Sequence, residues 1–591
     1  MSNINLIIDG INVTVPAGAT VLEAARKAGI NVPTLCYMKG VNNPGACRIC
    51  VCEVKGGRVL IAACVHPAYE GMEIFTNSPK VREARKSNME LILSEHDREC
   101  LTCVRNKNCE LQTLANDLNI GELPFLGERI VHEVDDASPG IVRDNNKCIQ
   151  CRRCVGMCKD VQETSVIDAQ NRGIFTKIGT YFDKSLDEAS CIVCGQCINV
   201  CPTGALYEKD HIAKVWAALE NPDLHIVVQT APAVRVALGE EFGDPIGTRV
   251  TTKMTRSLKR LGFDKIFDTN TGADFTIMEE GTELINRIKT GGVLPQFTSC
   301  SPGWVKYLET YAPEFIPNLS SCKSPHQMIG ALVKSYYAKH AGIDPAKIFV
   351  VSIMPCSAKK YEAERPEMEV NGLRDVDAVL TTRELARMIK TARINWKGLC
   401  TGKCKECDGV GCGFDEPFGS ATGAGAIFGT TGGVTEASLR TVTELMTGKP
   451  LENIEFNGAR GAEGIKEYTV DMDGFSLKGA VVSGMGNAKK VLEGIKSGKS
   501  DYHFIEFMGC PGGCITGGGQ PIVDAQTTEE VDVWKLRADA IYKGDETAKI
   551  RRSHENAFVK KVYEEIGEPG GHNAHELFHT EYKAKELYPV K

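Results

Sequence analysis

Cysteine is the residue type whose number and spacing in this chain point most directly to chemistry. It occurs 25 times in 591 residues. Most of these cysteines fall in five groups, at 36–64, 100–109, 148–158, 191–201 and 400–412. In a reducing compartment, thiols grouped in this way bind metal more often than they form disulfides. The groups therefore indicate several metal or iron–sulfur centres along one chain.

The first group has the spacing C-x10-C-x2-C-x13-C and consists of Cys36, Cys47, Cys50 and Cys64. Gly45 precedes the central pair, where a glycine lets the loop fold closely around an inorganic core. The pattern resembles a plant-type [2Fe-2S] ferredoxin domain, of the kind that opens hydrogenases and the large peripheral subunit of respiratory complex I. Cys52 stands two residues after Cys50 in VCEV, so we expect it to be a buried strand thiol and not a ligand.

The second group follows a helix-like stretch at 78–96 and has the pattern H-x3-C-x2-C-x5-C, formed by His96, Cys100, Cys103 and Cys109. A histidine at a helix end is usually a solvated cap. One that leads three cysteines at ligand spacing is expected to be the fourth ligand of a [4Fe-4S] cluster, because neutral imidazole can replace a thiolate on iron. The same pattern occurs at this place in the two families just named.

Two copies of C-x2-C-x2-C-x3-C follow, formed by Cys148, Cys151, Cys154, Cys158 and by Cys191, Cys194, Cys197, Cys201. In bacterial two-cluster ferredoxins the fourth cysteine of each run binds the other cluster. The expected ligand sets are therefore Cys148, Cys151, Cys154 and Cys201 for one [4Fe-4S] cluster, and Cys191, Cys194, Cys197 and Cys158 for the other. A zinc ribbon is the alternative, which the repeated spacing disfavours.

Beyond about residue 222 the pattern changes to apolar strand-like runs alternating with amphipathic helices, as in α/β layers. Runs at 296–300, 347–356 and 501–510 each end in a cysteine. Ligands of open α/β sheets bind beyond the carboxyl ends of the strands, so Cys300, Cys356 and Cys510 could converge on one site. Cys514, in the segment CPGGC, adds a fourth thiolate.

Three segments here resemble the signatures of the [FeFe]-hydrogenase catalytic domain: FTSCSPGW (297–304), MPCSAKKYE (354–362) and FMGCPGGCITGGGQP (507–521). TAPAVRVALGEEFG (230–243) and SHEN (553–556) are also similar to that family. With the iron–sulfur domains included, the resemblance spans nearly the whole chain. It implies an H-cluster, which is a [4Fe-4S] cubane joined through one cysteine to a diiron unit with CO, cyanide and azadithiolate. It also implies the reversible reduction of protons to H2.

The resemblance also assigns roles to single residues. Cys300, Cys356, Cys510 and Cys514 would serve the H-cluster, with Cys514 shared between the cubane and the diiron unit. Lys359 would donate to a cyanide ligand, although in a KK pair it could also be a surface lysine. The diiron pocket would be lined by Ala231, Pro232, Met354 and Met508. Protons would be relayed by Glu280, Glu283, Ser320 and Glu362. Glu280 and Glu283 are at i, i+3 and share one helix face, although two exposed acids would look the same.

One departure concerns Ser301, because the family usually has two adjacent cysteines there, the first a proton donor and the second a cubane ligand. Either Ser301 binds through oxygen, or the backbone shifts so that Cys300 ligates the cubane. We favour the shift, because iron–sulfur clusters prefer thiolates. Cys322 would then be a substitute proton donor, unless it is an inert buried thiol. His326 stands where the family often has glutamine.

A second departure is a Gly- and Lys-rich loop with the spacing C-x3-C-x2-C-x4-C, formed by Cys400, Cys404, Cys407 and Cys412. These thiols could hold an additional cluster or a structural zinc ion. Free or redox-sensing thiols are the alternative.

Composition excludes other classes of function. The 69 Lys and Arg against 76 Asp and Glu give a net charge of −7, which argues against nucleic acid as a partner. There is no apolar run of roughly 18–20 residues that could span a membrane. The first residues show no export signal, so we expect a cytoplasmic protein.

No G-x-G-x-x-G follows a strand, so electrons would come from ferredoxin or from NAD(P)-oxidising partner subunits. Hydrogenase maturation proteins would supply the diiron unit.

The sequence therefore predicts a multidomain protein with α+β N-terminal iron–sulfur domains and a large two-lobed α/β catalytic domain. The expected units are a [2Fe-2S] domain at 1–80, a His/Cys3 [4Fe-4S] domain at 81–125, a 2[4Fe-4S] ferredoxin domain at 139–212, and an H-cluster domain with a small-subunit-like tail at 222–591. A non-catalytic or sensory electron-transfer protein of the same descent is the alternative function. The three signatures exclude the complex I subunit.

Overall fold

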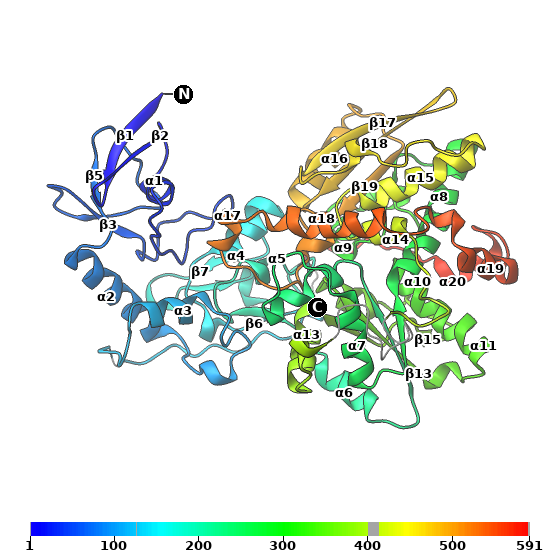
Figure 1. The fold of residues 1–591 in the computed structure, drawn as a ribbon, viewed down its shortest axis with the longest axis horizontal. Helices are drawn as coiled ribbons and strands as arrows, with labels where there is room; N and C mark the ends of the chain where they lie inside the picture. The colour runs from blue at the N-terminus through cyan, green and yellow to red at the C-terminus, as the bar shows by residue number, and fades with distance from the viewer. Residues whose placement is uncertain (1, 126, 400–412, 589–591) are drawn as a thin grey trace.

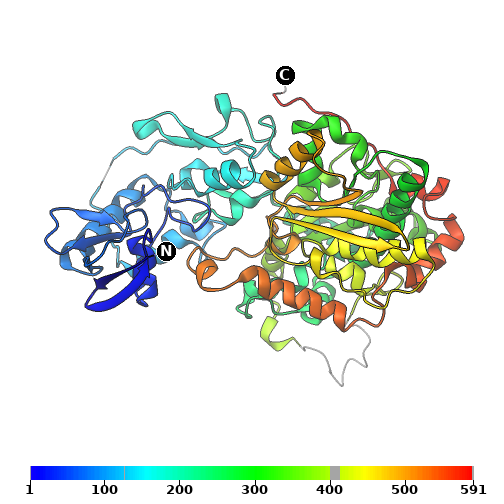
Figure 2. The ribbon, with the colours of Figure 1, turned by 90° about the horizontal axis from the view of Figure 1, so that it is seen from above.

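The computed structural model describes residues 2–125, 127–399 and 413–588. The chain folds into several domains arranged along one long axis (Figure 1). Small iron–sulfur modules lie at one end, and a larger α/β region forms the other end. The view from above separates the same two parts (Figure 2). Among the described residues, no helix combines the length and the apolar character needed to cross a bilayer.

The N-terminal module is a five-stranded sheet with the strand order β2-β1-β5-β3-β4. Its strands are β1 (Asn3–Ile8), β2 (Ile11–Pro16), β3 (Val51–Val54), β4 (Leu60–Ala62) and β5 (Glu73–Phe75). Strands β1 and β2 pair in antiparallel register and form a hairpin around Asp9. Helix α1 (Val21–Lys27) begins at a capping box between Thr20 and Glu23 and buries its apolar residues.

The next module is helical. Helix α2 (Pro79–Glu95) begins at the Ser78 cap, and its C-terminal cap is His96. Helix α3 (Glu110–Asp117) begins directly after Cys109. The loop between the two helices therefore carries the whole predicted His/Cys3 set.

A ferredoxin-like module built from two small sheets follows. Strand β6 (Ile141–Arg143) pairs with β9 (Leu206–Glu208), and β7 (Asp168–Gln170) pairs with β8 (Lys177–Gly179). Two short helices, α4 (Arg153–Gly156) and α5 (Gln196–Asn199), lie within the two cysteine runs. In Figure 1, α5 lies where the iron–sulfur modules meet the larger region.

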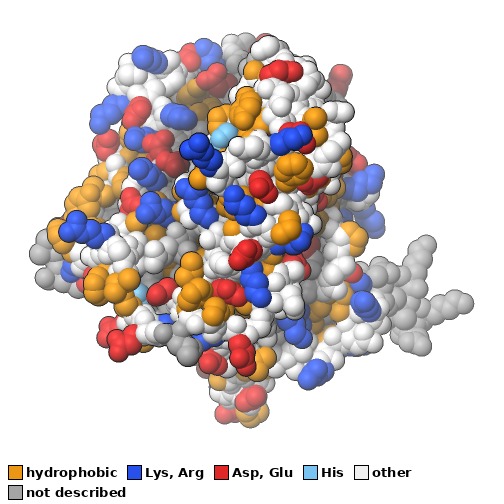
Figure 3. All heavy atoms as spheres, turned by 90° about the vertical axis from the view of Figure 1, so that its left-hand side faces the viewer, with side chains coloured by type: hydrophobic (Ala, Val, Ile, Leu, Met, Phe, Trp, Pro, Cys, Tyr) orange, Lys and Arg blue, Asp and Glu red, His pale blue; other side chains and the backbone are white. Residues whose placement is uncertain are grey.

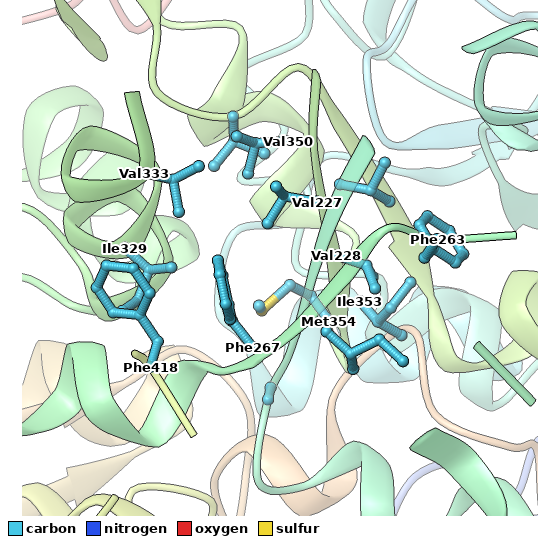
Figure 4. Packing of buried hydrophobic residues seen from close by; sticks show 14 of the residues in the cluster. Val227, Val228, Phe263, Phe267, Ile329, Val333, Val350, Ile353, Met354 and Phe418 are labelled. Atoms are coloured by element: carbon cyan, nitrogen blue, oxygen red, sulfur yellow. The ribbon is translucent and has the colours of Figure 1, made fainter. Parts of the chain in front are cut away.

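The larger region contains two four-stranded sheets. The first has the order β11-β10-β13-β16 and is parallel throughout. Its strands are β10 (His225–Thr230), β11 (Lys265–Asp268), β13 (Ile348–Met354) and β16 (Ala378–Thr381). Helices from both sides bury these strands, which explains their continuous apolar runs. Figure 4 shows Val227 and Val350 on the side of this sheet where Phe267, Ile329 and Val333 lie, and Val228 and Ile353 on the other side with Phe263.

The helices that accompany the first sheet are α6 (Ile212–Leu219), α7 (Thr251–Leu261), α10 (Pro325–Leu332), α11 (Ala338–Ala341), α12 (Ala358–Ala363) and α13 (Thr382–Thr391). A π-helical turn at Val333–Tyr337 joins α10 and α11. A two-stranded ribbon, β14 (Glu369–Val370) and β15 (Leu373–Arg374), stands beside them.

The second sheet has the order β12-β19-β18-β17. Its strands are β12 (Gln296–Phe297), β17 (Ile465–Met472), β18 (Phe475–Ser483) and β19 (Phe504–Met508). Only the β17–β18 pair is antiparallel. The accompanying helices are α8 (Thr269–Thr290), α9 (Pro302–Tyr311), α14 (Gly423–Ile427), α15 (Gly433–Thr447) and α16 (Met485–Lys496).

The C-terminal tail contains α17 (Thr527–Glu530), α18 (Val533–Glu546), α19 (Ala557–Ile566) and α20 (His572–Phe578). The SHEN segment fastens this tail to α8. Ser553 Oγ and Asn556 Nδ2 donate to the buried Asp274 carboxylate at 2.7 and 2.9 Å. Burial outweighs these hydrogen bonds and raises the pKa of Asp274 to about 6.

Candidate active site and metal centres

The carboxyl ends of β10 and β13 in the first sheet and of β12 and β19 in the second open onto one cavity. The residues that line it follow those strands or lie on helices nearby. They are Ala231, Pro232, Thr269, Ala273, Cys300, Ser301, Pro302, Pro325, His326, Met354, Pro355, Cys356, Lys359, Phe428, Met508, Gly509, Cys510, Gly513, Cys514 and Gly517. The structure thus brings together thiols that lie more than 200 residues apart, as the strand-end argument anticipates.

The four cysteines of the signature segments all line this cavity, and the loop after β19 carries two of them. Gly513 has φ 95°, a conformation that favours glycine. A Cβ atom there would lie 2.5 Å from the Thr431 nitrogen. Glycine is therefore required for the loop to present Cys510 and Cys514 on the same wall.

Cys300 and Ser301 differ in their surroundings. The Ser301 hydroxyl accepts a hydrogen bond from the Gly509 N–H at 3.0 Å, directly beside Cys510. Burial first, and then the nearby charge of Glu280, raise the pKa of the Cys300 thiol well above its usual value. Ser301 therefore lies beside Cys510, while Cys300 lies on the side of the acidic residues.

Lys359 belongs to a buried charged network at the cavity wall. Its Nζ donates to the Cys300 carbonyl at 3.1 Å and to Glu362 Oε2 at 2.7 Å. His326 Nε2 lies 2.6 Å from the same oxygen. Burial alone would raise the pKa of Glu362, but Lys359 and His326 outweigh it and lower that pKa to about 2. Lys359 is thus a buried cation that lines the cavity, and the surface-lysine alternative is wrong.

The acidic residues on α8 form a chain towards the surface. Ser320 Oγ donates to Glu283 Oε2 at 2.6 Å, and Arg287 holds the other Glu283 oxygen at 2.6 Å. Glu280 is fully buried, and its carboxylate oxygens have no hydrogen-bond partner among the described residues. Burial and the charge of Glu283 raise the pKa of Glu280 to about 8. Glu280 is therefore neutral near pH 7 and has a proton to give.

Two residues predicted for the proton path, Glu362 and Cys322, lie outside the series formed by Glu280, Glu283 and Ser320 or outside the lining of the cavity. Glu362, which the resemblance groups with the relay, shares the Lys359 and His326 network through its Oε2 atom. Cys322 is fully buried and lies 3.9 Å from Glu283 Oε2, but it is not among the residues that line the cavity. Cys322 therefore lies beside Glu283 and outside the lining of the cavity.

The predicted [2Fe-2S] cysteines are close together. The Cys50 and Cys64 sulfur atoms are 3.4 Å apart. A hydrogen bond from Cys36 lowers the pKa of Cys47 to about 6, so this pair readily loses a proton. Cys52 is fully buried in β3 and contacts the Cys50 carbonyl, and burial raises its pKa to about 12. The prediction of a buried strand thiol at Cys52 is confirmed.

His96 has the properties of a neutral ligand. It is 7 % exposed, and its Nδ1 has no hydrogen-bond partner within the part of the chain that the structure describes. Burial lowers its pKa to about 4, so the imidazole is uncharged and has a lone pair available. Cys109 lies against the Pro202 carbonyl of the ferredoxin-like module, with its sulfur 3.5 Å away.

The two cysteine runs of the ferredoxin-like module exchange their fourth members. One small cavity is lined by Cys148, Cys151, Cys154 and Cys201. A second is lined by Cys158, Cys191, Cys194 and Cys197. In residues 2–125, 127–399 and 413–588, no three His, Cys, Asp or Glu side chains are placed to hold a single metal ion. Thiols spread around a cavity fit a polynuclear cluster better than a zinc ion.

Some site residues were missed by reasoning from sequence. Thr269 follows the carboxyl end of β11, so the strand-end rule could have found it. Phe428, beyond α14, has no such signal in the sequence. The loop of Cys400, Cys404, Cys407 and Cys412 lies outside the described residues.

Comparison with known families gives one consistent assignment. The family "iron only hydrogenase large subunit, C-terminal domain" matches residues 224–518, and "iron hydrogenase small subunit" matches 531–585. A 2Fe-2S iron–sulfur cluster binding domain matches 1–79. The NADH-ubiquinone oxidoreductase-G iron–sulfur binding region matches 85–124, and the ferredoxin-like domain of NADH-quinone oxidoreductase subunit 3 matches 138–207.

Relatives match over nearly the whole chain. The NADP-reducing hydrogenase subunit HndD of Solidesulfovibrio fructosivorans is 46% identical, over 98% of this chain and 99% of its own. Iron hydrogenase 1 of Clostridium pasteurianum is 43% identical, with the same coverage. A solved variant of [FeFe]-hydrogenase HydA1 from Chlamydomonas reinhardtii is 41% identical, covers 64% of this chain and 99% of its own, and has a TM-score of 0.56. The chain therefore belongs to the iron-only, or [FeFe], hydrogenases, and it is a hydrogenase with iron–sulfur domains at its N-terminus.

Proposed function

We propose that this enzyme reduces protons to H2, and oxidises H2 in reverse, at the cavity between the two sheets. The observation that carries the proposal is the convergence of Cys300, Cys356, Cys510 and Cys514 with buried Lys359. Each sheet would be the centre of one lobe of the catalytic domain. When bound, an H-cluster would supply the iron at which two protons and two electrons combine.

The residues that would hold this cofactor fit its chemistry. Cys356, Cys510 and Cys514 offer soft thiolates on one wall, and Cys514 would be the thiolate shared with the diiron unit. Ala231, Pro232, Met354 and Met508 give the rest of the cavity an apolar lining that excludes water. Lys359 Nζ, already partnered by Glu362, would still have a proton to donate to an anionic ligand such as cyanide.

Cys300 would be the proton donor, and Ser301 would occupy the fourth cubane position. The contacts of both residues support this arrangement over the shifted ligand favoured by the sequence. Ser301 Oγ is already held beside Cys510 by the Gly509 N–H, whereas Cys300 lies near Glu280. Cys322 is then not needed as a donor. Its place beside Glu283 makes it a neighbour of the relay.

Protons would travel from the surface to the cavity along α8. Arg287 and Glu283 are each partly exposed, with side-chain exposures of 15% and 17%. Ser320 bonds to Glu283, and Glu280, neutral at pH 7, would pass a proton to Cys300. A relay of this kind requires a group that binds and releases protons near the working pH.

Electrons would reach the cavity through one [2Fe-2S] cluster and three accessory [4Fe-4S] clusters. Their ligands would be the four sets described above, with His96 in the second set. A fifth accessory site at Cys400, Cys404, Cys407 and Cys412 remains a prediction from sequence. The diiron unit would be supplied by maturation proteins, and the enzyme would act in the cytoplasm.

The immediate electron partner would be ferredoxin or an NAD(P)-linked subunit. HndD, similar over its full length, is named as a subunit of an NADP-reducing hydrogenase. Figure 3 shows the face of the iron–sulfur end, where charges of both signs are mixed with exposed hydrophobic side chains. Leu101, between Cys100 and Cys103, is 91% exposed. A redox partner docking there would come close to the His96 set.

The alternative is an electron-transfer or assembly protein of the same descent. The cytosolic Fe-S cluster assembly factor narfl of Danio rerio is 31% identical, over 61% of this chain and 87% of its own. That lower identity and shorter coverage support the alternative less than the near-complete matches to hydrogenases support catalysis.

H2 evolution by protein loaded with the diiron cofactor tests the proposal, with a reduced viologen as electron donor. Wild type should evolve H2, and Cys514→Ala should not, because the diiron unit would lose its thiolate. Cys52→Ala is the control, because Cys52 lies in β3 of the N-terminal module and does not line the cavity. Activity retained in Cys514→Ala would overturn the assignment.

A further inference from the structure

The loops of the second ferredoxin-like thiol set are fastened directly to the loops of the cavity thiols. Gln162, four residues after Cys158, donates its Nε2 to the Gly509 carbonyl at 2.8 Å, beside Cys510. Ser357, directly after Cys356, donates its Oγ to the Val193 carbonyl at 2.8 Å, beside Cys194. Two cysteine-bearing loops of each module are thus joined by a buried hydrogen bond.

Helix α5 adds further bonds to the loop that follows Cys514. Gln196 Nε2 donates to the Thr516 carbonyl at 2.9 Å. Asn199 Nδ2 donates to the Thr516 and Gly517 carbonyls at 3.2 and 3.1 Å. Gln196 and Asn199 lie on either side of Cys197 in the sequence. Their hydrogen bonds therefore fix the position of this thiol relative to the loop after Cys514.

The backbones of the two modules touch at a pair of glycines. Gly195 follows Cys194 and has φ 70°. A Cβ atom on Gly518 would lie 2.4 Å from the Cys194 carbonyl oxygen and 2.6 Å from Gly195 Cα. A Cβ atom on Gly195 would lie 2.3 Å from Ser357 Oγ. Only glycine at both positions allows this approach.

Arg383 holds the same loop from the other side. Its guanidinium donates to the Gly518 carbonyl at 2.7 Å and to Glu208 Oε2 at 2.7 Å. Glu208 belongs to β9 of the ferredoxin-like module, and Arg383 is only 7% exposed. The module is therefore fixed to the cavity loop by a buried ion pair as well as by the amide side chains.

We propose that Gln162, Gln196, Asn199 and Ser357 form a clamp that sets the electron-transfer distance between the second ferredoxin-like cluster and the active-site cubane. The inference rests on the proposed function, which places a cluster at each thiol set. With both clusters bound, one electron at a time would pass from the reduced accessory cluster to the oxidised active site, and in the opposite direction during H2 oxidation. A one-electron carrier, such as a reduced viologen or ferredoxin, refills the accessory chain. Tunnelling rates fall steeply with distance, so the clamp residues are positioning residues for this step.

The test separates electron transfer from chemistry at the active site. Gln196→Met with Asn199→Leu removes the clamp bonds of α5 while keeping side-chain volume. Gly518→Ala is a second, independent variant that forces the backbones apart. Gln150→Met is the matched control, because Gln150 bonds the Thr176 carbonyl on an exposed part of the same module.

Two rates are measured in cofactor-loaded protein. The first is isotope exchange between H2 and D2O, which needs no electron from the accessory clusters. The second is the reduction of the accessory clusters by H2, followed by freeze-quench electron paramagnetic resonance. We expect the clamp variants to lose roughly tenfold or more in the second rate, equivalent to about 1.4 kcal/mol, because the two clusters would lie further apart. Exchange should stay at the wild-type rate, and full signals after dithionite reduction should show that all clusters are present.

An equal loss in both rates would mean that the clamp only supports the fold, and unchanged cluster reduction would mean that it sets no distance. Either result overturns the inference. Absence of exchange in wild type would instead refute the proposed function, so the two failures are distinguishable.

Discussion

Glu280→Gln should stabilise the protein at neutral and alkaline pH while it impairs catalysis. Glu280 is fully buried, and its carboxylate oxygens have no hydrogen-bond partner among the described residues, so an amide of the same shape loses no bond. Burial and the charge of Glu283 raise its pKa from 4.5 to about 8. The folded protein must therefore take up a proton that the unfolded chain has already released at pH 7.

The sign and size of the effect follow from proton linkage. Because the folded pKa is the higher one, the carboxyl is protonated in both states below pH 4.5, where the folded protein is penalised least, and stability is lost as the pH rises from 4.5 towards 8. At pH 7 the proton uptake costs about 3 kcal/mol, from about 1.4 kcal/mol for each unit between 4.5 and 7. Gln avoids this cost. The gain in the free energy of unfolding should therefore be about 3 kcal/mol at pH 7 and under about 1 kcal/mol at pH 5.

Anaerobic denaturant unfolding of wild type and Glu280→Gln at pH 5, 7 and 8 measures this difference, and H2 evolution is measured on the same samples. Activity should fall by roughly 10²–10⁴-fold, the usual loss when a general acid is removed. Glu279→Gln is the contrasting control, because the Glu279 carboxylate accepts bonds from Tyr563, Gly570 and His579 at 2.5, 2.8 and 3.0 Å. That variant should lose stability at pH 8. The reasoning is refuted if Glu280→Gln is no more stable than wild type at pH 8, or if it keeps full activity.

Two more predictions concern the ligands. Cys300→Ala should retain the cubane signal in electron paramagnetic resonance while H2 evolution falls roughly 10²–10⁴-fold. Ser301→Cys should change that signal to one of four-thiolate ligation. Loss of the cubane in Cys300→Ala would instead support ligation by Cys300. Fully loaded protein should contain about 20 iron atoms per chain, or more if the loop of Cys400, Cys404, Cys407 and Cys412 binds a cluster. Replacing these four cysteines by serine should lower the iron content only in the latter case, which elemental analysis with a protein assay decides.

Local spacing made most of the cluster residues predictable, because a cluster takes several ligands from a few neighbouring turns of chain. The exchange of Cys158 and Cys201 between two cavities follows from the repeated cysteine run and is seen in the structure. The burial of Cys52 follows from its alternation with Cys50 in β3. A rule about parallel strands accounts for Cys300 and Cys510, because β12 and β19 are neighbours in one sheet, but Cys356 follows β13 of the other sheet, and that rule does not say how the two sheets face each other.

Other features depend on contacts between distant segments, which no local pattern contains. The environment of Ser301 depends on the Gly509 N–H, 208 residues away. The sequence places Glu362 three residues after Lys359, whether or not Glu362 carries protons. Only the structure shows that His326 also contacts the Glu362 carboxylate. The amide bonds of the clamp, from Gln162, Gln196 and Asn199, span more than 300 residues, and Gln or Asn in a ferredoxin-like loop gives no sign of them.

The infrared spectrum of the cofactor-loaded protein tests the central claim most directly, because CO and cyanide ligands absorb where protein does not. If the cavity between the two sheets holds the H-cluster, wild type and Cys52→Ala should show these bands, and Cys514→Ala should lack them after the same loading. Bands of wild-type strength in Cys514→Ala would show that the diiron unit is bound elsewhere and would contradict the account.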